Sequence, residues 1–340
     1  MNFSENISLK KYNSFGIEAK AKFFAGFSDK AELDGLLQSR EVKSNPLMIL
    51  GGGSNILLTT DFNGVVLKNE IRGIEILEET DDHVILKAGA GENWHGFVTH
   101  CVNNGFAGVE NLSLIPGNVG ASPMQNIGAY GVEIKDVFEE LEAYHIKDRV
   151  THKFRVEDCA FGYRESVFKN KYKGEFIINS VSFRLNKKPV INTSYGAIQQ
   201  ELENMGVNEP GIKDVSQAVI NIRSSKLPDP AKVGNAGSFF KNPMIDVVKF
   251  EALKSNYPSI VAFPTGESKM KLAAGWLIEQ CGWKGFRKGD AGCYPKQALV
   301  LVNYGNASGK EIYHLSESII QSVKDKFGVE LEREVNVVRD

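Results

Sequence analysis

Apolar residues recur along the chain at two spacings, and the spacing changes from one segment to the next. The run at 47–50 is continuously apolar and stops at three glycines, which is typical of a buried strand that leads into a turn. Strand-like runs also cover 64–68, 73–77 and 84–88, and the alternation over 175–185 predicts a further strand. These segments predict several short strands in the first half of the chain.

Helical spacing marks other segments of the same region. Asp29 followed by Glu32 predicts a capped helix start, because leucines at helical spacing come directly after it. The segment 93–103 is also predicted to be helical. Strands and helices are therefore mixed within one region.

The residue composition of the chain changes near residue 228. Two prolines within 227–230 predict a connection between domains, because proline restricts its own backbone and that of the residue before it. Beyond it we predict a helix over 269–281 and a strand over 297–303.

The end of the chain carries a clear helix signal. Ser308 and Glu311 form a capping-box pattern, apolar residues follow at helical spacing as far as Phe327, and Gly328 is a natural C-cap. Alternation over 329–337 then predicts a final strand, with Glu334 on the same face as Glu330 and Glu332.

Composition narrows the classes of function. The chain has 340 residues, of which 42% are hydrophobic, so two or three domains with real cores are expected. Lys+Arg 40 against Asp+Glu 42 leaves a net charge of -2, without the basic excess of a nucleic-acid binder. Apolar runs are too short to span a bilayer and no signal core is visible, so a cytoplasmic protein is expected. Four cysteines without a Cys-x-x-Cys pair predict no metal site, and no obligate protein partner is indicated.

Two glycine-rich segments can bring backbone close to a ligand. The segment 51–55 can present successive N–H groups to a pyrophosphate, although it is neither a Gly-x-Gly-x-x-Gly fingerprint nor a Walker loop. In 116–131, Gln125 and Asn126 carry amides that can read the edge of a flavin. Taken alone, the first segment is equally an ordinary turn between strands. The second is harder to explain as only a tight structural loop.

Three side chains suggest chemistry on an anionic substrate. Ser238 lies between a Gly/Asn-rich turn and two aromatic residues, and Arg164 follows Tyr163 and can clamp a carboxylate. Taken alone, Arg164 reads as a surface arginine in a salt bridge and Glu334 as part of a solvated face. Lys226 and Tyr195 have similar ordinary readings, as an exposed cation and a half-buried phenol.

Together these motifs resemble the UDP-N-acetylenolpyruvoylglucosamine reductase family, nearly end to end, from 12–16 to 331–335. The most specific pieces are 125–131, 161–164 and 234–243. The resemblance implies an α+β fold, with an FAD-binding domain of the vanillyl-alcohol-oxidase (PCMH) type in two α/β subdomains and a third α/β domain that binds substrate.

The resemblance also implies domain bounds. The FAD-binding region would cover 1–227, with a core at about 15–186 whose subdomains divide near residue 70. The substrate-binding domain would cover 228–327, and a C-terminal strand at 328–340 would return to the FAD-binding region.

The family's chemistry implies a role for each candidate residue. NADPH reduces FAD, and flavin N5 then delivers hydride to C3 of the enolpyruvyl group of UDP-N-acetylglucosamine enolpyruvate. Ser238 would donate the proton to C2, while Arg164 and Glu334 would polarise the carboxylate. Substrate contacts would come from Tyr163, Tyr195, Lys226, Asn242 and Gln297, with Tyr195 marking the type I branch of the family.

FAD is expected to bind without a covalent link, because neither glycine-rich loop contains a histidine or cysteine. The residues expected to hold it are Gly51, Gly52, Gly53, Ser54, Asn55, Ile56, Pro116, Gly117, Asn118, Gly120, Ser122, Gln125, Asn126, Gly128, Tyr130 and Gly131.

The chain departs from the family pattern at three positions. Phe263 stands where a tyrosine is usual, Asn118 replaces a threonine, and Asn336 replaces a frequent basic residue. Two other functions remain open at this point. One is another FAD-dependent oxidase or dehydrogenase of the same fold, and the other is a flavin-binding protein without catalysis.

Overall fold

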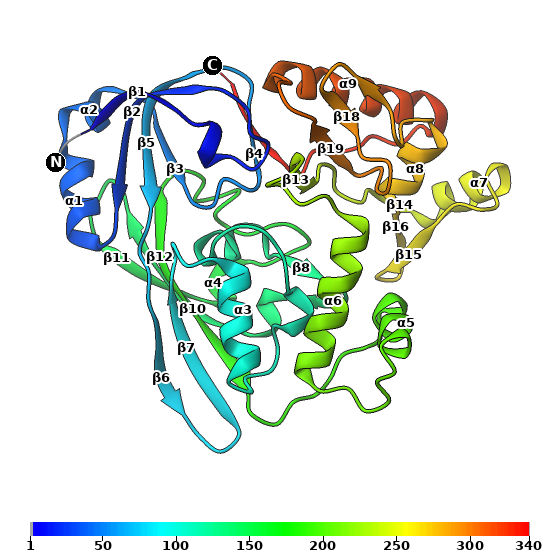
Figure 1. Cartoon of the computed structure of the whole chain (residues 1–340), viewed down its shortest axis with the longest axis horizontal. Coiled ribbons are helices and arrows are strands. Elements are labelled where there is room, and N and C mark those ends of the chain that lie inside the picture. Colours follow the sequence, from blue (N-terminus) through cyan, green and yellow to red (C-terminus); the bar gives the residue numbers. More distant parts are fainter. Residues whose placement is uncertain (1–2, 340) are drawn as a thin grey trace. The chain divides into compact units, whose positions relative to one another are not determined.

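The computed structural model describes residues 3–339, and these form two compact units (Figure 1). The first unit contains the N-terminal residues up to Ile7 together with Ala21–Gly52 and Asn63–Ser225. The second unit contains Ser8–Lys20, Gly53–Phe62 and the chain from Lys226 onward. Each unit is therefore assembled from segments that are distant in sequence.

The described part of the first unit contains two larger sheets, the short antiparallel pair β8-β9, and six helices. A four-stranded sheet has the order β1-β2-β5-β3, in which β3 and β5 are parallel, and a five-stranded antiparallel sheet has the order β11-β10-β12-β7-β6. The strands that lie wholly or mostly in this unit are β1 (Ser4–Ser8), β2 (Lys20–Phe27), β3 (Leu47–Leu50), β5 (Phe62–Asn69), β6 (Ile74–Glu79), β7 (His83–Gly89), β8 (Gly128–Ala129), β9 (Val132–Glu133), β10 (Phe138–His145), β11 (Thr151–Arg155) and β12 (Phe176–Asn186). Its helices are α1 (Lys30–Gln38), α2 (Arg40–Ser44), α3 (Trp94–Asn103), α4 (Val156–Cys159), α5 (Gly196–Asn204) and α6 (Ile212–Lys226), with short 3-10 turns η2 (Glu110–Leu112), η3 (Val119–Ala121), η4 (Pro123–Gln125) and η5 (Ile134–Asp136).

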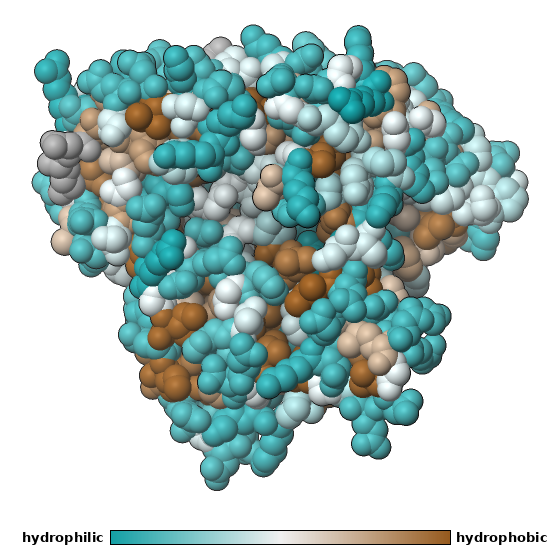
Figure 2. Space-filling view, in the orientation of Figure 1, coloured by the Kyte–Doolittle hydropathy of each residue, from teal (hydrophilic) through white to brown (hydrophobic). Residues whose placement is uncertain are grey.

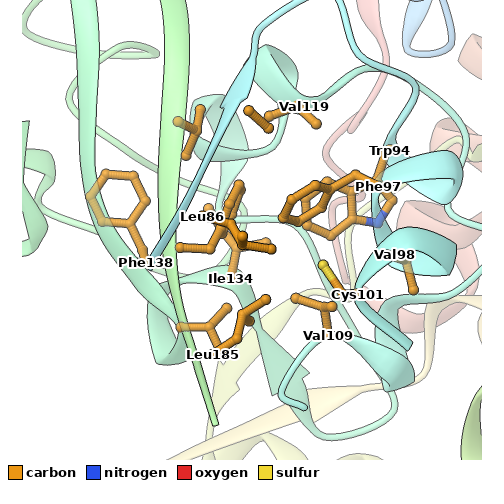
Figure 3. Packing of buried hydrophobic residues seen from close by; sticks show 14 of the residues in the cluster. Leu86, Trp94, Phe97, Val98, Cys101, Val109, Val119, Ile134, Phe138 and Leu185 are labelled. Atoms are coloured by element: carbon orange, nitrogen blue, oxygen red, sulfur yellow. The ribbon is translucent and has the colours of Figure 1, made fainter. Parts of the chain in front are cut away.

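The helix α3 packs on one face of the five-stranded sheet and builds the largest core of this unit (Figure 3). The side chain of Asn93 caps it by accepting a hydrogen bond from Gly96 N at 2.8 Å. Its apolar residues fall at helical spacing, so Trp94 and Phe97 both reach the buried Phe183 of β12. The helix predicted over 93–103 is thereby confirmed.

Most of the other elements predicted for this unit are also confirmed. The strands predicted at 64–68, 73–77, 84–88 and 175–185 correspond to β5, β6, β7 and β12, and the run at 47–50 is β3. The Asp29 side chain accepts a hydrogen bond from Glu32 N at 2.8 Å and begins α1.

Figure 2 shows a mainly hydrophilic surface on the viewed face, with separate apolar patches between the polar side chains. Among residues 3–339, no helix combines the length and the apolar character needed to cross a membrane.

The second unit contains a four-stranded sheet of order β13-β19-β18-β17, a three-stranded sheet of order β14-β16-β15, and the parallel pair β20-β4. Its elements are η1 (Lys10–Tyr12), β4 (Ile56–Leu58), β13 (Gly234–Ser238), β14 (Met244–Asp246), α7 (Val247–Asn256), β15 (Ala262–Thr265), β16 (Lys269–Leu272), α8 (Ala274–Gln280), β17 (Arg287–Lys288), β18 (Ala291–Cys293), β19 (Val300–Asn303), α9 (Gly309–Phe327) and β20 (Asn336–Val338).

The capping box that begins α9 is formed as the sequence predicts. Ser308 Oγ accepts a hydrogen bond from Glu311 N at 3.3 Å, and the Glu311 carboxylate accepts one from Ser308 N at 2.8 Å. Gly328 ends the helix with φ 62, in the left-handed conformation that glycine adopts without a steric cost. The predicted helix up to Phe327 is confirmed.

The helix predicted over 269–281 is wrong in its first part. Lys269–Leu272 is the strand β16, which pairs antiparallel with β14 on one side and β15 on the other. Its Lys-Met-Lys-Leu sequence has period two, so two flanking strands can satisfy its backbone, and the helix α8 begins only at Ala274.

The strand predicted over 329–337 is also mostly wrong. Regular pairing is limited to β20, and upstream of it a single bridge joins Arg333 to Phe240. The segment is still held in place, because Lys241 N donates to Glu332 O at 2.9 Å. The alternation correctly indicated an extended chain, but not how few strand partners that chain would meet.

Gly309 gives a test of this packing, because a Cβ there would lie 1.8 Å from Leu58 O. We expect Gly309→Ala to lower the free energy of unfolding by about 1–3 kcal/mol through overpacking. Gly196 is the matched control. It also begins a helix, and a Cβ there would meet nothing within 4 Å. Thermal unfolding should show a lower Tm for Gly309→Ala only, and equal Tm values for the two variants would contradict this account.

Candidate functional site

A glycine-rich loop in the first unit lies directly on the chain that enters α3. Gly120 N donates to Ala90 O at 3.0 Å, and Trp94 N donates to Gly117 O at 3.0 Å. The Asn118 side chain donates to Gly91 O at 3.1 Å. The first part of the loop, 117–120, is therefore fixed by backbone and side-chain bonds to the segment 90–94.

Two glycines are required by this close approach. A Cβ on Gly120 would lie 2.4 Å from the Ala90 Cβ, and a Cβ on Gly52 would lie 2.9 Å from the Gly117 Cα. The loop that begins at Gly51 and the loop at Gly117 therefore meet backbone to backbone. Such a bare backbone surface suits a pyrophosphate, because N–H groups can approach phosphate oxygens without side chains in the way. The residues present therefore fit FAD.

Lys68 adds a positive charge beside these loops, and the sequence motifs did not reveal it. Its ammonium donates to Gly51 O at 3.1 Å, and burial lowers the pKa of this lysine. It lies on β5, whose apolar pattern gives no sign that a lysine there faces a glycine turn.

The side chain of Asn126 has a structural role. It is fully buried, donates to Glu133 Oε2 at 2.9 Å and to Gly162 O at 3.1 Å, and accepts from Lys135 N at 3.2 Å. Its backbone is left-handed, with φ 42. The amide predicted to read a flavin edge therefore fastens the loop to the turn that carries Arg164.

Arg164 is oriented by the same loop. Its Nη2 donates to Gly128 O at 2.8 Å, and the guanidinium carbon lies 5.4 Å from the centre of the Tyr163 ring. Arg164 has φ 57, in the left-handed region that is unfavourable for a residue with a Cβ and that persists where the surroundings enforce it. A hydrogen-bonded turn between Gly162 and Glu165 imposes this conformation.

A second arginine lies near Arg164, and sequence analysis missed it. Arg223 of α6 interacts with Tyr130, and burial, followed by repulsion from Arg164, lowers the pKa of its guanidinium. Tyr130 in turn packs edge-on against Tyr195, with ring centres 5.2 Å apart, and burial raises the Tyr130 pKa. The only sequence signal was that Arg223 follows the buried Ile222 on an apolar helix face.

In the second unit, the structure brings Ser238 and Glu334 together. Ser238 is exposed at the end of β13, opposite Val300, and Gly237 before it has φ 68. Glu334 N donates to the carbonyl of Phe239, the residue after Ser238, at 2.8 Å. These two residues are distant in sequence and lie beside each other through backbone pairing.

Glu334 also differs from the glutamates with which it was grouped. It is half-buried, while Glu330 and Glu332 are exposed. Asn55 donates to Glu334 O at 3.2 Å, so the segment 53–56 is attached to the Glu334 backbone. Within that segment, Gly53 has φ 63, and a Cβ there would lie 1.9 Å from Tyr12 O.

Two candidate substrate contacts lie at the start of α8. Asn242 Oδ1 accepts a hydrogen bond from Ala274 N at 2.9 Å, and Gln297 Oε1 would lie 3.1 Å from a Cβ built on Gly275. Lys226, by contrast, is exposed at the end of α6.

The candidate residues therefore divide between the two units. The first unit carries Gly51, Gly52, the loop 116–131, Tyr163, Arg164 and Tyr195, and the second carries Gly53, Ser54, Asn55, Ile56, Lys226, Ser238, Asn242, Gln297 and Glu334.

Full-length relatives are similar to this chain throughout. The UDP-N-acetylenolpyruvoylglucosamine reductase of Flavobacterium johnsoniae is 51% identical over 339 residues, covering 99% of this chain and 100% of that protein. The reductase of the same name from Chromobacterium violaceum is 49% identical over 335 residues, covering 98% of each. The chain belongs to the UDP-N-acetylenolpyruvoylglucosamine reductase family.

Family models and solved structures agree with this membership. Residues 21–150 match an FAD binding domain, and residues 229–338 match the C-terminal domain of UDP-N-acetylenolpyruvoylglucosamine reductase. The crystal structure of the reductase from Thermus caldophilus shares the fold, with a TM-score of 0.70 and 24% identity, and covers 100% of each chain. The 4-ethylphenol oxidase from Gulosibacter chungangensis has a TM-score of 0.50 at 12% identity, with 94% of this chain and 82% of that one covered. The fold is α+β, with an FAD-binding region of the vanillyl-alcohol-oxidase type.

Proposed function

We propose that this chain carries out NADPH-dependent reduction of UDP-N-acetylglucosamine enolpyruvate to UDP-N-acetylmuramate in peptidoglycan precursor synthesis. The main support is identity of 51% over nearly the whole chain to a reductase of this name. When bound, FAD would supply the hydride chemistry that couples oxidation of NADPH to reduction of the enolpyruvyl group. We place this reaction in the cytoplasm, and we propose the division into 1–227, 228–327 and 328–340 as its domain plan.

The substrate carboxylate sets the main chemical problem. Its negative charge makes the neighbouring double bond a poor hydride acceptor, so the charge must be neutralised as the reaction proceeds. Arg164 is suited to this, because a planar guanidinium can grip a carboxylate with two hydrogen bonds. The bond from its Nη2 to Gly128 O fixes the plane of the guanidinium before substrate arrives.

Glu334 would polarise the same carboxylate, which requires that it carry or share a proton. Backbone hydrogen bonds at its N–H, to Phe239 O, and at its C=O, from Asn55, hold its main chain in place. Its half-buried position separates it from the exposed glutamates nearby.

Ser238 would donate the proton that completes the reduction at C2. A serine hydroxyl is a weak acid, so donation is plausible only to a strongly basic enolate-like carbon. The exposed position at the end of β13 presents the hydroxyl to a ligand, and Gly237 before it supplies the left-handed turn.

Two other functions that the sequence leaves open have less support. Another FAD-dependent oxidase or dehydrogenase of this fold would not need the Ser238 turn. A flavin-binding protein without catalysis would not need Ser238, Arg164 and Glu334 together.

The first test separates the two half-reactions. Ser238→Ala should slow flavin reoxidation by the enolpyruvyl substrate by about 10²–10⁴-fold, the usual effect of losing a general acid. Flavin reduction by NADPH should be unchanged, because that step needs no proton from Ser238. Anaerobic stopped-flow absorbance follows both steps, and equal slowing of the two would show that Ser238 is only structural.

The second test compares three glutamates. Glu334→Gln should lower kcat strongly with little change in KM, because the amide cannot share a proton as charge develops. Glu330→Gln is the matched control: Glu330 and its partner Lys324 are both exposed, so the free energy of unfolding should change by no more than about 0.5 kcal/mol and turnover should stay intact. Glu332→Gln should also leave turnover intact, although it removes the charge that pairs with the buried Lys241 ammonium. Steady-state kinetics that show three silent variants would remove Glu334 from the mechanism.

A further inference from the structure

Leu114 has an unusual backbone that two side chains hold from opposite ends. Its φ is 59, in the left-handed region that disfavours residues with a Cβ. Its N–H donates to His95 Nδ1 at 3.1 Å, and its carbonyl accepts from Arg223 Nε at 3.2 Å. His95 belongs to α3 and Arg223 to α6, so two separate helices fix one residue.

Leu114 lies immediately before the cofactor loop. Only Ile115 separates it from Pro116, where the segment that packs on Ala90 begins. A residue in an unfavourable conformation keeps that conformation only where its surroundings enforce it. Releasing either end of Leu114 would therefore let the start of the loop relax away from the geometry in which it packs on Ala90.

We propose that His95 is a positioning residue for FAD, which holds the Leu114 peptide only in its neutral form and so makes cofactor affinity depend on pH. This proposal rests on the proposed function only in taking the loop after Leu114 as part of the FAD site.

The hydrogen bond fixes the protonation state of the ring. Because Leu114 N–H is a donor, Nδ1 must accept, and the proton of the neutral ring lies on Nε2. Protonation of His95 at Nδ1 would point its new N–H at the N–H of Leu114, and the hydrogen bond between them would break. Burial, and next the positive charge of Arg223, lower the pKa of His95, so the neutral form is favoured in this structure.

The acidic groups on the segments that flank α3 are already bonded. The Glu92 carboxylate accepts from Gly73 N at 2.7 Å, and the Glu110 carboxylate accepts from Gly108 N at 2.6 Å. Arg223 is the charged group that acts on His95, and it opposes protonation.

The sign of the pH effect follows from linkage. If His95 must be neutral for FAD to bind, its contribution to the binding free energy is complete above its ordinary pKa of about 6.5. That contribution is lost as the pH falls and the ring is protonated. FAD affinity should therefore be constant above about pH 7 and should weaken at most about tenfold per pH unit below about pH 6.

The experiment measures the FAD dissociation constant of the apoprotein between pH 5 and 8.5, on the order of the range in which histidine titrates. Quenching of FAD fluorescence gives the constant for the wild type, His95→Gln, His95→Leu and His100→Gln. His100 is the matched control, since it lies on the same helix and is exposed. Thermal unfolding of each apoprotein checks the fold.

His95→Gln should bind FAD like the wild type at pH 8 and lose the acid-side weakening, because an amide oxygen accepts the same bond and does not titrate. His95→Leu should bind about tenfold more weakly at every pH, the scale of one lost hydrogen bond. His100→Gln should match the wild type. An acid-side weakening retained in His95→Gln would overturn the proposal, and so would wild-type affinity in a folded His95→Leu. A wild type that fails to bind FAD would instead contradict the proposed function.

Discussion

The approach of the Pro116–Gly120 backbone to the segment Ala90–Trp94 is the constraint on which the candidate cofactor site depends. Backbone hydrogen bonds cross this contact in both directions, and a single methyl group on Gly120 would not fit. The segment Ala90–Trp94 leads into α3, and the apolar face of this helix is buried in a large core (Figure 3). The loop is therefore attached to a segment that the core holds in place. The candidate cofactor loop is thus given the rigidity of the core.

The same kind of support extends from the loop to Arg164, the candidate catalytic side chain of the first unit. Asn126 and Gly128 continue the loop, and both bond to the turn that contains Arg164. The left-handed backbones of Asn126 and Arg164 are two unfavourable conformations that these bonds maintain. In the second unit, the chain after Ser238 pairs through its backbone with the chain before β20, and this pairing holds Glu334 in position.

The sequence predicted local features well and tertiary ones poorly. The side chains of Ser308 and Asn93 accept hydrogen bonds from backbone N–H groups three residues further along the chain. Because these contacts are local, the helices that they begin could be predicted from the sequence alone. The strand β16 was predicted as a helix because the four residues Lys269–Leu272 are too few for their hydrophobic periodicity to distinguish a strand from a helix. The sequence also does not reveal the two strands that pair with it. The motif residues were enough to indicate the family. Arg223, Lys68 and His95 belong to no motif, because only the folded chain shows which loop each of them contacts.

The most direct test of this account is the FAD dissociation constant of Gly120→Ala, measured by fluorescence quenching on the apoprotein. The account predicts binding weaker by about tenfold or more, since overpacking of about 1–3 kcal/mol would move the loop off Ala90. Gly96→Ala is the control, because it lies on α3 and its Cβ would make ordinary contacts at 3.6 Å. Wild-type affinity in Gly120→Ala would contradict the claim that this backbone contact forms the cofactor site.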